Sequence, residues 1–519
     1  MNRMIRSFNL PATPCVAALA LFCSLYSIAA FGAAPVPSVT GPLKVTADSY
    51  PFNAASTTAV PQDLSQHGYV EEEYLVSGKA NVYDFGTSGK VMIKAPDAPY
   101  TTRILVRRPA EKSRFSGNVI LELLNPSLLY DWDPQWMFSN GYFIEHRDIW
   151  IGITAKPVAA KALMKFNPER YAALSWANPL PLGKTCAQSA LSSDSAPETE
   201  NGLIWDIMSQ VGALVRSDEK QNPLRGFKVE YLYATGYSQT GAFLLTYINF
   251  IRPLPTAMRK NGKPVYDGYL IGDGDMFAPP INQCSQPSPT GVPATIVQPR
   301  KEPVISIATE GLLSMTVVAR RPDSDAPDDR YRRYEVPAAS HGNHLVLEYA
   351  PRPGETEKAG VPTAAPKCIG SDKYGITDFP YEYLMNAAFA NLDAWTRSNI
   401  PPPRAQMIET ESGGSSQDFR VKTDKHGNAV GGLRTPYLDV PVATYYSRTK
   451  PADEKSGNFC GAQGYKVPFE KEKILALYPS REVYLGKVSA MVNSMVKARL
   501  LTANDGEKIK KDAEKLSAW

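Results

Sequence analysis

A serine lies at a break between a strand and a helix near the middle of the chain. Residues 231–235 are aromatic and β-branched, which is typical of a buried strand, and residues 242–250 have a helical pattern. Between them stands "GYSQTG", residues 236–241, with Ser238 at its centre. A serine on so sharp a turn is raised clear of the sheet edge, as in a nucleophile elbow. The usual elbow has glycine two residues after the serine, whereas this chain has Thr240 there and glycine one residue later.

A serine hydroxyl is a weak nucleophile at neutral pH and needs a histidine to accept its proton. In a chain with such an elbow, the base follows the serine and the acid, in a loop after the last strands. This order favours His341, which follows an apolar strand and a turn of small residues in "YEVPAASHGNH". His344 is the alternative, and His426 in "DKHGN" is typical of a hairpin turn. The remaining histidines, His67 and His146, precede the serine.

The third member of such a site is a carboxylate that holds the imidazole in the correct tautomer. Glu310 ends the strand "PVISIAT", between the serine and His341, and is the predicted acid. Aspartates compete with it: Asp273 and Asp275 in "IGDGD", and Asp323 and Asp325 in a segment that is typical of a solvated loop.

An oxyanion hole needs two backbone N–H groups, and each donor contributes about 3–4 kcal/mol to stabilising the transition state. Gln239 follows the serine at a helix N-terminus and is the first predicted donor. The second is expected in the loop after the strand "NVILEL", where Pro126 has no N–H. Asn125 or Ser127 must then donate.

Short apolar strands alternate with helical segments from Gly68 onward, which predicts a mostly parallel sheet covered on both faces. The first two strands, 69–83 and 101–110, are expected to be antiparallel, and 142–155 is expected to be a further strand. Irregular segments at 276–301 and 350–447 are interpreted as insertions, which either wall or cover a pocket or only decorate the surface. The chain is expected to end in two amphipathic helices, separated by a polar break at 503–506.

The N-terminus predicts export. Arg3 and Arg6 precede an apolar segment and the small residues around position 33, as in a cleaved signal peptide covering residues 1–33. The predicted mature chain, 34–519, is expected to form one large domain in the periplasm or outside the cell. No later segment is long and apolar enough to cross a bilayer.

Net charge indicates which partners to expect, and cysteine content indicates whether disulfides form. The predicted mature chain has 54 basic and 52 acidic residues, so no excess charge points to nucleic acid or an anionic membrane as partner. It keeps Cys186, Cys284, Cys368 and Cys460, an even number in an oxidising compartment. Spacing does not choose among the three possible connectivities. The favoured interpretation is Cys186–Cys284 with Cys368–Cys460, and no spacing typical of a zinc site occurs.

Several strings together resemble a family of bacterial α/β-hydrolase-domain proteins. They span nearly the whole predicted mature chain: "YVEEEYLVSGKANVY", "YTTRILVRRPAEKSRFSGNVILELLN", "FNPERYAALSWANP", "GYSQTG", "YEVPAASH" and "GNAVGGLRTPYLDVPVA". The resemblance implies an α/β-hydrolase fold with Ser238 as nucleophile, Glu310 as acid and His341 as base. The chain departs from the family in the loop "NPSLLYDWDPQW", which usually carries glycine, and after Glu310, where an aspartate often stands.

These features predict an exported serine hydrolase that cleaves a carboxylic ester or lactone without a metal or organic cofactor. Apolar residues beside the predicted site suggest a small-molecule ester with hydrophobic surface, although they could equally be core: Leu128, Leu129, Trp132 and Trp136. The alternatives are other acyl chemistry on the same scaffold, by an acyltransferase or a peptidase, and a binding protein that has lost catalysis.

Overall fold

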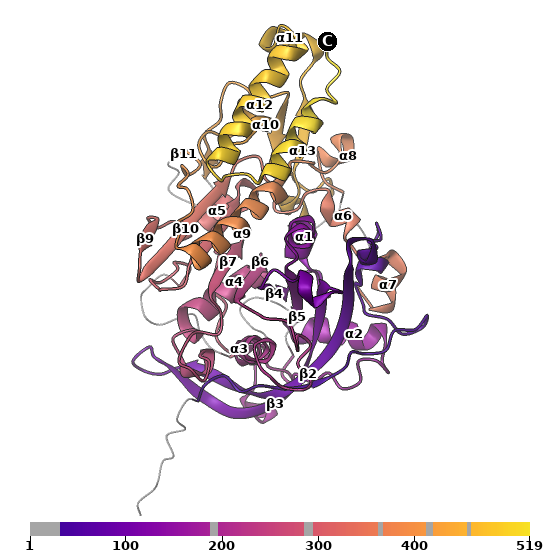
Figure 1. Cartoon of the computed structure of the whole chain (residues 1–519), viewed down its shortest axis with the longest axis vertical. Coiled ribbons are helices and arrows are strands. Elements are labelled where there is room, and N and C mark those ends of the chain that lie inside the picture. Colours follow the sequence, from indigo (N-terminus) through magenta and orange to yellow (C-terminus); the bar gives the residue numbers. More distant parts are fainter. Residues whose placement is uncertain (1–31, 187–195, 285–293, 362–366, 412–418, 454–457) are drawn as a thin grey trace, which may run out of the picture.

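The computed structural model describes residues 32–186, 196–284, 294–361, 367–411, 419–453 and 458–519 (Figure 1). The predicted signal peptide lies outside the described residues except for its last two positions. Within the described part of the chain, no helix is both long enough and apolar enough to cross a membrane.

A sheet of ten strands forms the centre of the molecule. Its order is β1-β2-β3-β5-β4-β6-β7-β8-β10-β9. The strands are β1 Ser38–Thr40, β2 Tyr69–Phe85, β3 Val91–Pro109, β4 Asn118–Leu124, β5 Ile149–Thr154, β6 Tyr231–Tyr237, β7 Gly268–Gly272, β8 Val304–Thr309, β9 Ser324–Ala326 and β10 Asp329–Val336.

The inner strands β5, β4, β6, β7, β8 and β10 run parallel to one another. Every residue of β4, β5, β7 and β8 is buried, as expected of strands covered on both faces. The long strands β2 and β3 pair antiparallel, as predicted, and form the curved ribbon at the bottom of Figure 1. The carboxyl ends of the parallel strands therefore share one edge of the sheet.

Helices cover both faces of the sheet. On one face α1 (Pro134–His146) packs against α9 (Tyr381–Ser398), and on the other lie α3 (Ile204–Val215) and α4 (Gln239–Thr246) (Figure 1). Other helices are α2 Pro157–Phe166, α5 Leu313–Thr316, α6 Leu345–Glu348, α7 Pro353–Lys358, α8 Ser371–Tyr374, α10 Pro436–Asp439 and α11 Lys471–Leu477. This arrangement confirms the predicted α/β-hydrolase fold.

The predicted strand at 142–155 is only partly correct. Strand β5 begins at Ile149, and residues 142–146 form the last turns of α1. The start of this helix depends on Glu122 in β4, whose carboxylate accepts the amides of Gln135 at 2.8 Å and Trp136 at 3.1 Å. Burial raises the pKa of Glu122 to about 8, while these hydrogen bonds oppose that shift. The helix thus depends on a partner distant in the chain, which local periodicity could not reveal.

The two predicted C-terminal helices are α12 (Arg481–Lys497) and α13 (Ala503–Ala513), and they stand together at the top of Figure 1. The expected break at 503–506 is wrong, because those residues form the first turn of α13. Thr502 caps this turn by accepting the amide of Asp505 at 3.1 Å. The Asp505 carboxylate accepts Asn386 Nδ2 of α9 at 2.9 Å, so the helices are docked on the sheet-covering layer.

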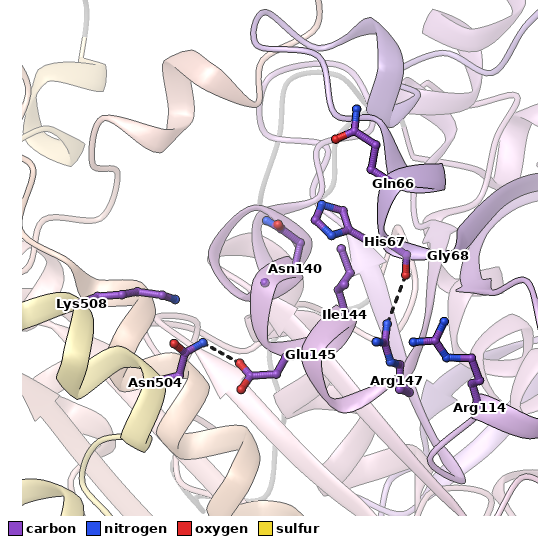
Figure 2. A pocket seen from close by; sticks show the side chains of 11 residues that line it. Gln66, His67, Gly68, Arg114, Asn140, Ile144, Glu145, Arg147, Asn504 and Lys508 are labelled. Carbon is purple, nitrogen blue, oxygen red and sulfur yellow. Dashed lines mark hydrogen bonds between the residues drawn. The ribbon is translucent and has the colours of Figure 1, made fainter.

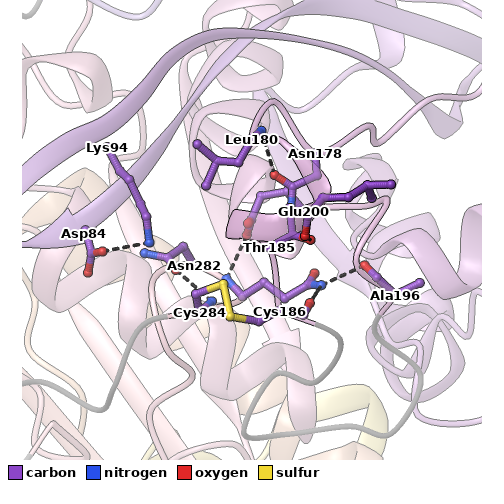
Figure 3. The surroundings of a disulfide bond; sticks show 12 residues. Asp84, Lys94, Asn178, Leu180, Thr185, Cys186, Ala196, Glu200, Asn282 and Cys284 are labelled. Atoms are coloured by element: carbon purple, nitrogen blue, oxygen red, sulfur yellow. Dashed lines mark hydrogen bonds and ion pairs between the residues drawn. A yellow bond between two sulfur atoms is a disulfide. The ribbon is translucent and has the colours of Figure 1, made fainter.

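The segments between the main elements contain two small antiparallel sheets and two disulfides. The sheets are β11 Thr410–Glu411 with β12 Arg420–Val421, and β13 Ala443–Tyr446 with β14 Tyr465–Pro468. The disulfides Cys186–Cys284 and Cys368–Cys460 confirm the favoured pairing. Around the first, shown in Figure 3, Gln283 Nε2 donates to Ala196 O at 2.7 Å and Cys284 N donates to Asn282 Oδ1 at 2.8 Å.

Candidate active site

Ser238 stands between the end of β6 and the start of α4 with a left-handed backbone. Its φ is 57° and its ψ is −123°, a conformation that a residue with a side chain rarely adopts. The amide of Ser238 donates to Gly272 O at the end of β7, at 2.8 Å. A strained backbone conformation persists only where the surrounding structure holds it, and such conformations are concentrated at functional turns. The sharp strand-to-helix turn that a nucleophile elbow requires is therefore present.

Thr240 and Gly241 explain why the elbow tolerates its unusual spacing. Thr240 Oγ1 donates to Tyr237 O at 3.0 Å and accepts the Tyr237 amide at 3.2 Å, so its side chain ties the turn together. A Cβ on Gly241 would lie 2.8 Å from the Cα of Gly274, after β7. A Cβ on Gly236 would lie 2.3 Å from Thr240 O. Gly236 and Gly241 thus stand where the backbone is too close for a Cβ, whereas the position of Thr240 has room for a side chain.

His341 lies in the loop after β10 and reaches the elbow. Its imidazole stacks on the ring of Tyr237, with centroids 4.9 Å apart and 17° between the planes. The side chain is 13% exposed. Its neighbour Gly342 donates to Ala462 O at 2.8 Å, which anchors the loop to the C-terminal part of the chain. Among the described residues no hydrogen bond joins Ser238 Oγ to the imidazole, and such bonds often tighten only when substrate is present.

The carboxylate that contacts His341 is Asp273, which corrects the prediction of Glu310. His341 Nδ1 lies 2.5 Å from Asp273 Oδ2, and the Asp273 side chain is fully buried. Thr309 holds this carboxylate through its amide at 3.0 Å and its Oγ1 at 2.7 Å. Asp273 directly follows β7, at the same sheet edge as Ser238 and His341. Asp273 was a candidate because it follows a strand. Glu310 also follows a strand and also lies between Ser238 and His341 in the sequence, so the order of residues could not show which of the two contacts the histidine.

Glu310 has two other partners. Its carboxylate accepts the amide of Ala338 at 2.7 Å and the hydroxyl of Ser447 at 2.9 Å. Burial raises the pKa of Glu310, and these two hydrogen bonds oppose the shift. Ala338 has a φ of 67° and lies three residues before His341. Glu310 therefore supports the backbone of the histidine loop rather than the imidazole.

The other candidates for base and acid are engaged elsewhere. His344 is 37% exposed and lies 3.7 Å from Glu348. Asp275 pairs with buried Arg333 and accepts Ser306 Oγ at 2.7 Å. Asp323 and Asp325, predicted in a solvated loop, both pair with buried Arg332. None of these contacts is to His341.

The two predicted oxyanion donors differ in their availability. Gln239 is the first residue of α4, and its amide has no acceptor inside the helix. The prediction of Asn125 is wrong, because its amide already donates to Trp132 O at 2.7 Å. The alternative Ser127 donates its amide to Asn125 Oδ1 at 2.8 Å. The side chain of Asn125 instead connects this loop to the end of β6, since Asn125 Nδ2 donates to Tyr237 O at 2.8 Å.

The apolar residues of the same loop divide into core and surface. Trp132 is 6% exposed and packs edge-on against Tyr237, and Trp136 is 1% exposed beneath the Arg107 guanidinium. Leu129 is 41% exposed. The two tryptophans are therefore part of the core, whereas Leu129 is open to solvent.

A pocket of about 490 Å³ lies elsewhere, at the end of α1 and beside α13, as Figure 2 shows. His67, Arg114 and Arg147 are among its lining residues, and Ser238, Asp273 and His341 are not. In the part of the chain that the structure describes, no three His, Cys, Asp or Glu side chains are grouped to hold a metal ion.

A protein-family model agrees with this architecture. A family model described as an alpha/beta hydrolase domain matches residues 39–511. A search of curated proteins found no significant match. Solved structures with similarity include a dienelactone hydrolase from Anabaena variabilis, at 13% identity and a TM-score of 0.25, covering 55% of this chain and 94% of that one. A serine hydrolase from Xanthomonas campestris has 11% identity and a TM-score of 0.23, with coverage of 55% and 96%. A poly(3-hydroxybutyrate) depolymerase from Bordetella parapertussis has 10% identity and a TM-score of 0.25, with coverage of 63% and 92%.

Proposed function

The chain belongs to the alpha/beta hydrolase domain family, and from this premise we propose that it is an exported serine hydrolase that cleaves a carboxylic ester or lactone. The observation that carries the proposal is the Asp273–His341 hydrogen bond of 2.5 Å, beside an elbow whose central residue is Ser238. In the proposed triad Ser238 is the nucleophile, His341 the base and Asp273 the acid.

The direction of the Asp273 contact assigns the protons on the imidazole. A carboxylate only accepts, so Nδ1 carries the hydrogen and donates to Asp273, which leaves Nε2 free to accept a proton from Ser238 Oγ. Asp273 also stabilises the imidazolium that forms when that proton moves. Two hydrogen bonds from Thr309 keep the carboxylate oriented during this step.

The reaction then proceeds in two halves. Ser238 Oγ attacks the carbonyl carbon as His341 takes its proton, and the tetrahedral intermediate places its negative oxygen toward the Gln239 amide at the start of α4. His341 returns the proton to the leaving alkoxide, which departs as the alcohol and leaves an acyl-enzyme. Water attacks this ester with His341 again as base, and the acid product leaves with Ser238 restored.

Covalent labelling tests the nucleophile directly. A fluorophosphonate should label the wild-type protein at the peptide that contains Ser238, as read by mass spectrometry. Ser209→Ala is the matched control, because Ser209 is a buried serine of α3 whose hydroxyl is hydrogen-bonded to Tyr247 at 2.9 Å, away from the elbow. That variant should still be labelled at Ser238. A folded wild-type protein that takes no label, or takes it at another serine, contradicts the proposal.

Turnover gives the second test. Ser238→Ala should lower kcat on an activated short-chain ester by about 10⁶-fold, because without the nucleophile only transition-state binding remains. The thermal unfolding midpoint should stay close to that of the wild type. Product analysis with added alcohol or amine separates hydrolysis from acyl transfer, since a transferase forms the new ester or amide in preference to the free acid.

Export is proposed on two grounds. The signal-like N-terminus precedes the described residues, and the two disulfides are typical of an oxidising compartment. Cell fractionation followed by N-terminal sequencing should find a chain that begins near residue 34.

A further inference from the structure

Tyr237, the residue before the proposed nucleophile, contacts His341 at two separate points. Its ring stacks on the imidazole at a centroid distance of 4.9 Å, and its hydroxyl donates to His341 O at 2.6 Å. The side chain is fully buried. Burial, with Asp273 nearby, raises the pKa of Tyr237 well above its ordinary value, so the hydroxyl remains a donor. One residue therefore holds both the ring and the backbone of the histidine.

The ring of Tyr237 is itself fixed by three aromatic neighbours. Phe138 packs at 5.2 Å, Tyr381 at 6.3 Å and Trp132 at 6.4 Å between ring centroids. The contacts with Phe138 and Trp132 are edge-to-face, and the contact with Tyr381 is tilted. Such contacts restrain the orientation of the ring as well as its position. The imidazole thus rests on a surface that cannot easily rotate.

Asp273 and Tyr237 restrain different motions of the imidazole. The hydrogen bond to Asp273 fixes which edge of the ring faces the carboxylate, and the tyrosine face fixes the plane in which the ring lies. Because Tyr237 and Ser238 are adjacent across a strained elbow, the same backbone sets the plane of the base and the place of the nucleophile.

We propose that Tyr237 is a positioning residue, which holds the His341 imidazole in the plane needed to take the Ser238 proton and stabilises the imidazolium through its ring face. This role rests on the proposed serine-hydrolase function. An aromatic face attracts a cation more strongly than a neutral ring, so the contact is stronger after proton transfer than before it. An interaction that strengthens in this way raises kcat and leaves KM largely unchanged.

Three variants separate the contacts. Tyr237→Phe keeps the stacked ring and loses only the hydroxyl bond, and its kcat should fall less than about 5-fold. Tyr237→Leu loses both contacts, and its kcat should fall about 10–100-fold because the base is no longer held in place. The matched control is Tyr266→Leu, since Tyr266 is also fully buried and its hydroxyl also donates to a backbone carbonyl, Met208 O at 2.8 Å. Its ring packs against Tyr247 and Tyr269, away from the proposed site. The kcat of Tyr266→Leu should stay well above that of Tyr237→Leu.

A spectroscopic measurement tests the contact without activity. In the wild-type protein the ring protons of His341 should be shifted upfield by the tyrosine face, and Tyr237→Leu should remove this displacement while Tyr237→Phe retains it. This readout also applies if Tyr237→Leu is too unstable to assay, because the shift is already measured in the wild type and in Tyr237→Phe.

The proposal is overturned if the His341 ring protons show no upfield displacement in the wild type, or if folded Tyr237→Leu keeps the wild-type kcat. An equal loss of kcat in Tyr237→Leu and Tyr266→Leu also overturns it, since that result indicates general loosening of the core. Failure of the proposed function looks different. In that case the wild type takes no label at Ser238 and hydrolyses no ester, whatever the resonances of His341 show.

Discussion

Two neighbouring strands each end in an acidic residue, and the two acids have different roles. Asp273 follows β7 and is bound by His341 and Thr309, whereas Glu310 follows β8 and is bound by Ala338 and Ser447. Both acids support the same loop. Asp273 holds the side chain of the histidine, and Glu310 holds the backbone that leads to it.

The difference comes from one residue of β8. Thr309, the last residue of that strand, donates its hydroxyl hydrogen to Asp273, which follows β7. The next residue, Glu310, begins a short helical turn beneath the histidine loop. Two acids thus follow neighbouring strands at this edge of the sheet, and the hydrogen bonds from Thr309 orient Asp273 toward the imidazole.

Between the two acids, the largest expected effect is that of Asp273→Asn. This change should lower kcat by about 10³–10⁴-fold, because asparagine can donate where the aspartate only accepts and so favours the wrong tautomer of His341. The matched control is Glu310→Gln, the same isosteric change on the next strand. It should retain most of the wild-type kcat in a steady-state ester assay. The reverse ranking of these variants would restore Glu310 as the acid of the triad.

Glu310→Ala should act mainly on stability. It leaves the Ala338 amide and the Ser447 hydroxyl without their acceptor, at a cost of about 1–3 kcal/mol in the free energy of unfolding. Glu310→Gln keeps a carbonyl oxygen for Ala338 and an NH₂ for Ser447, so it should unfold at a higher urea concentration than Glu310→Ala. Equal midpoints for the two variants would show that these hydrogen bonds contribute nothing.

A smaller effect is expected from a change in Ser447, whose hydroxyl donates to Glu310. Ser447→Ala removes one donor to Glu310 and should lower the free energy of unfolding by about 1 kcal/mol. Because the Ala338 bond to Glu310 remains, kcat should change little. A loss of kcat as large as that of Asp273→Asn would mean that Ser447 acts on the imidazole itself.

The smallest effect expected is a pH dependence. Burial raises the pKa of Glu310 above its value in the unfolded chain, so between those two values the folded protein binds the extra proton. The stability that this proton contributes is fully present below the unfolded pKa, and is lost as pH rises through the folded one. Relative to Glu310→Gln, the wild type should therefore lose thermal stability on going from acidic to neutral pH. A parallel pH dependence of the two melting temperatures would contradict this assignment.

Much of the molecule follows from local sequence pattern. Short β-branched segments between amphipathic ones predicted the parallel sheet and its two helical layers, because burial on both faces demands continuous apolar strands. The glycines around Ser238 predicted the elbow, since only residues without a Cβ allow strand and helix so close. Helix boundaries were less predictable. The start of α1 depends on Glu122, and the start of α13 on a cap at Thr502 that the polar break concealed.

The sequence by itself determined the strand-turn-helix that carries Ser238, a histidine in the loop after a late strand, and a set of acids at strand ends. Only the tertiary structure decided which acid contacts the histidine, which amides of the Asn125 loop are already used, and that Tyr237 lies against the base. The reason is physical. A strand pattern specifies which residues are buried and which end a strand, whereas the partner of a side chain depends on strand order and register, which join residues tens of positions apart.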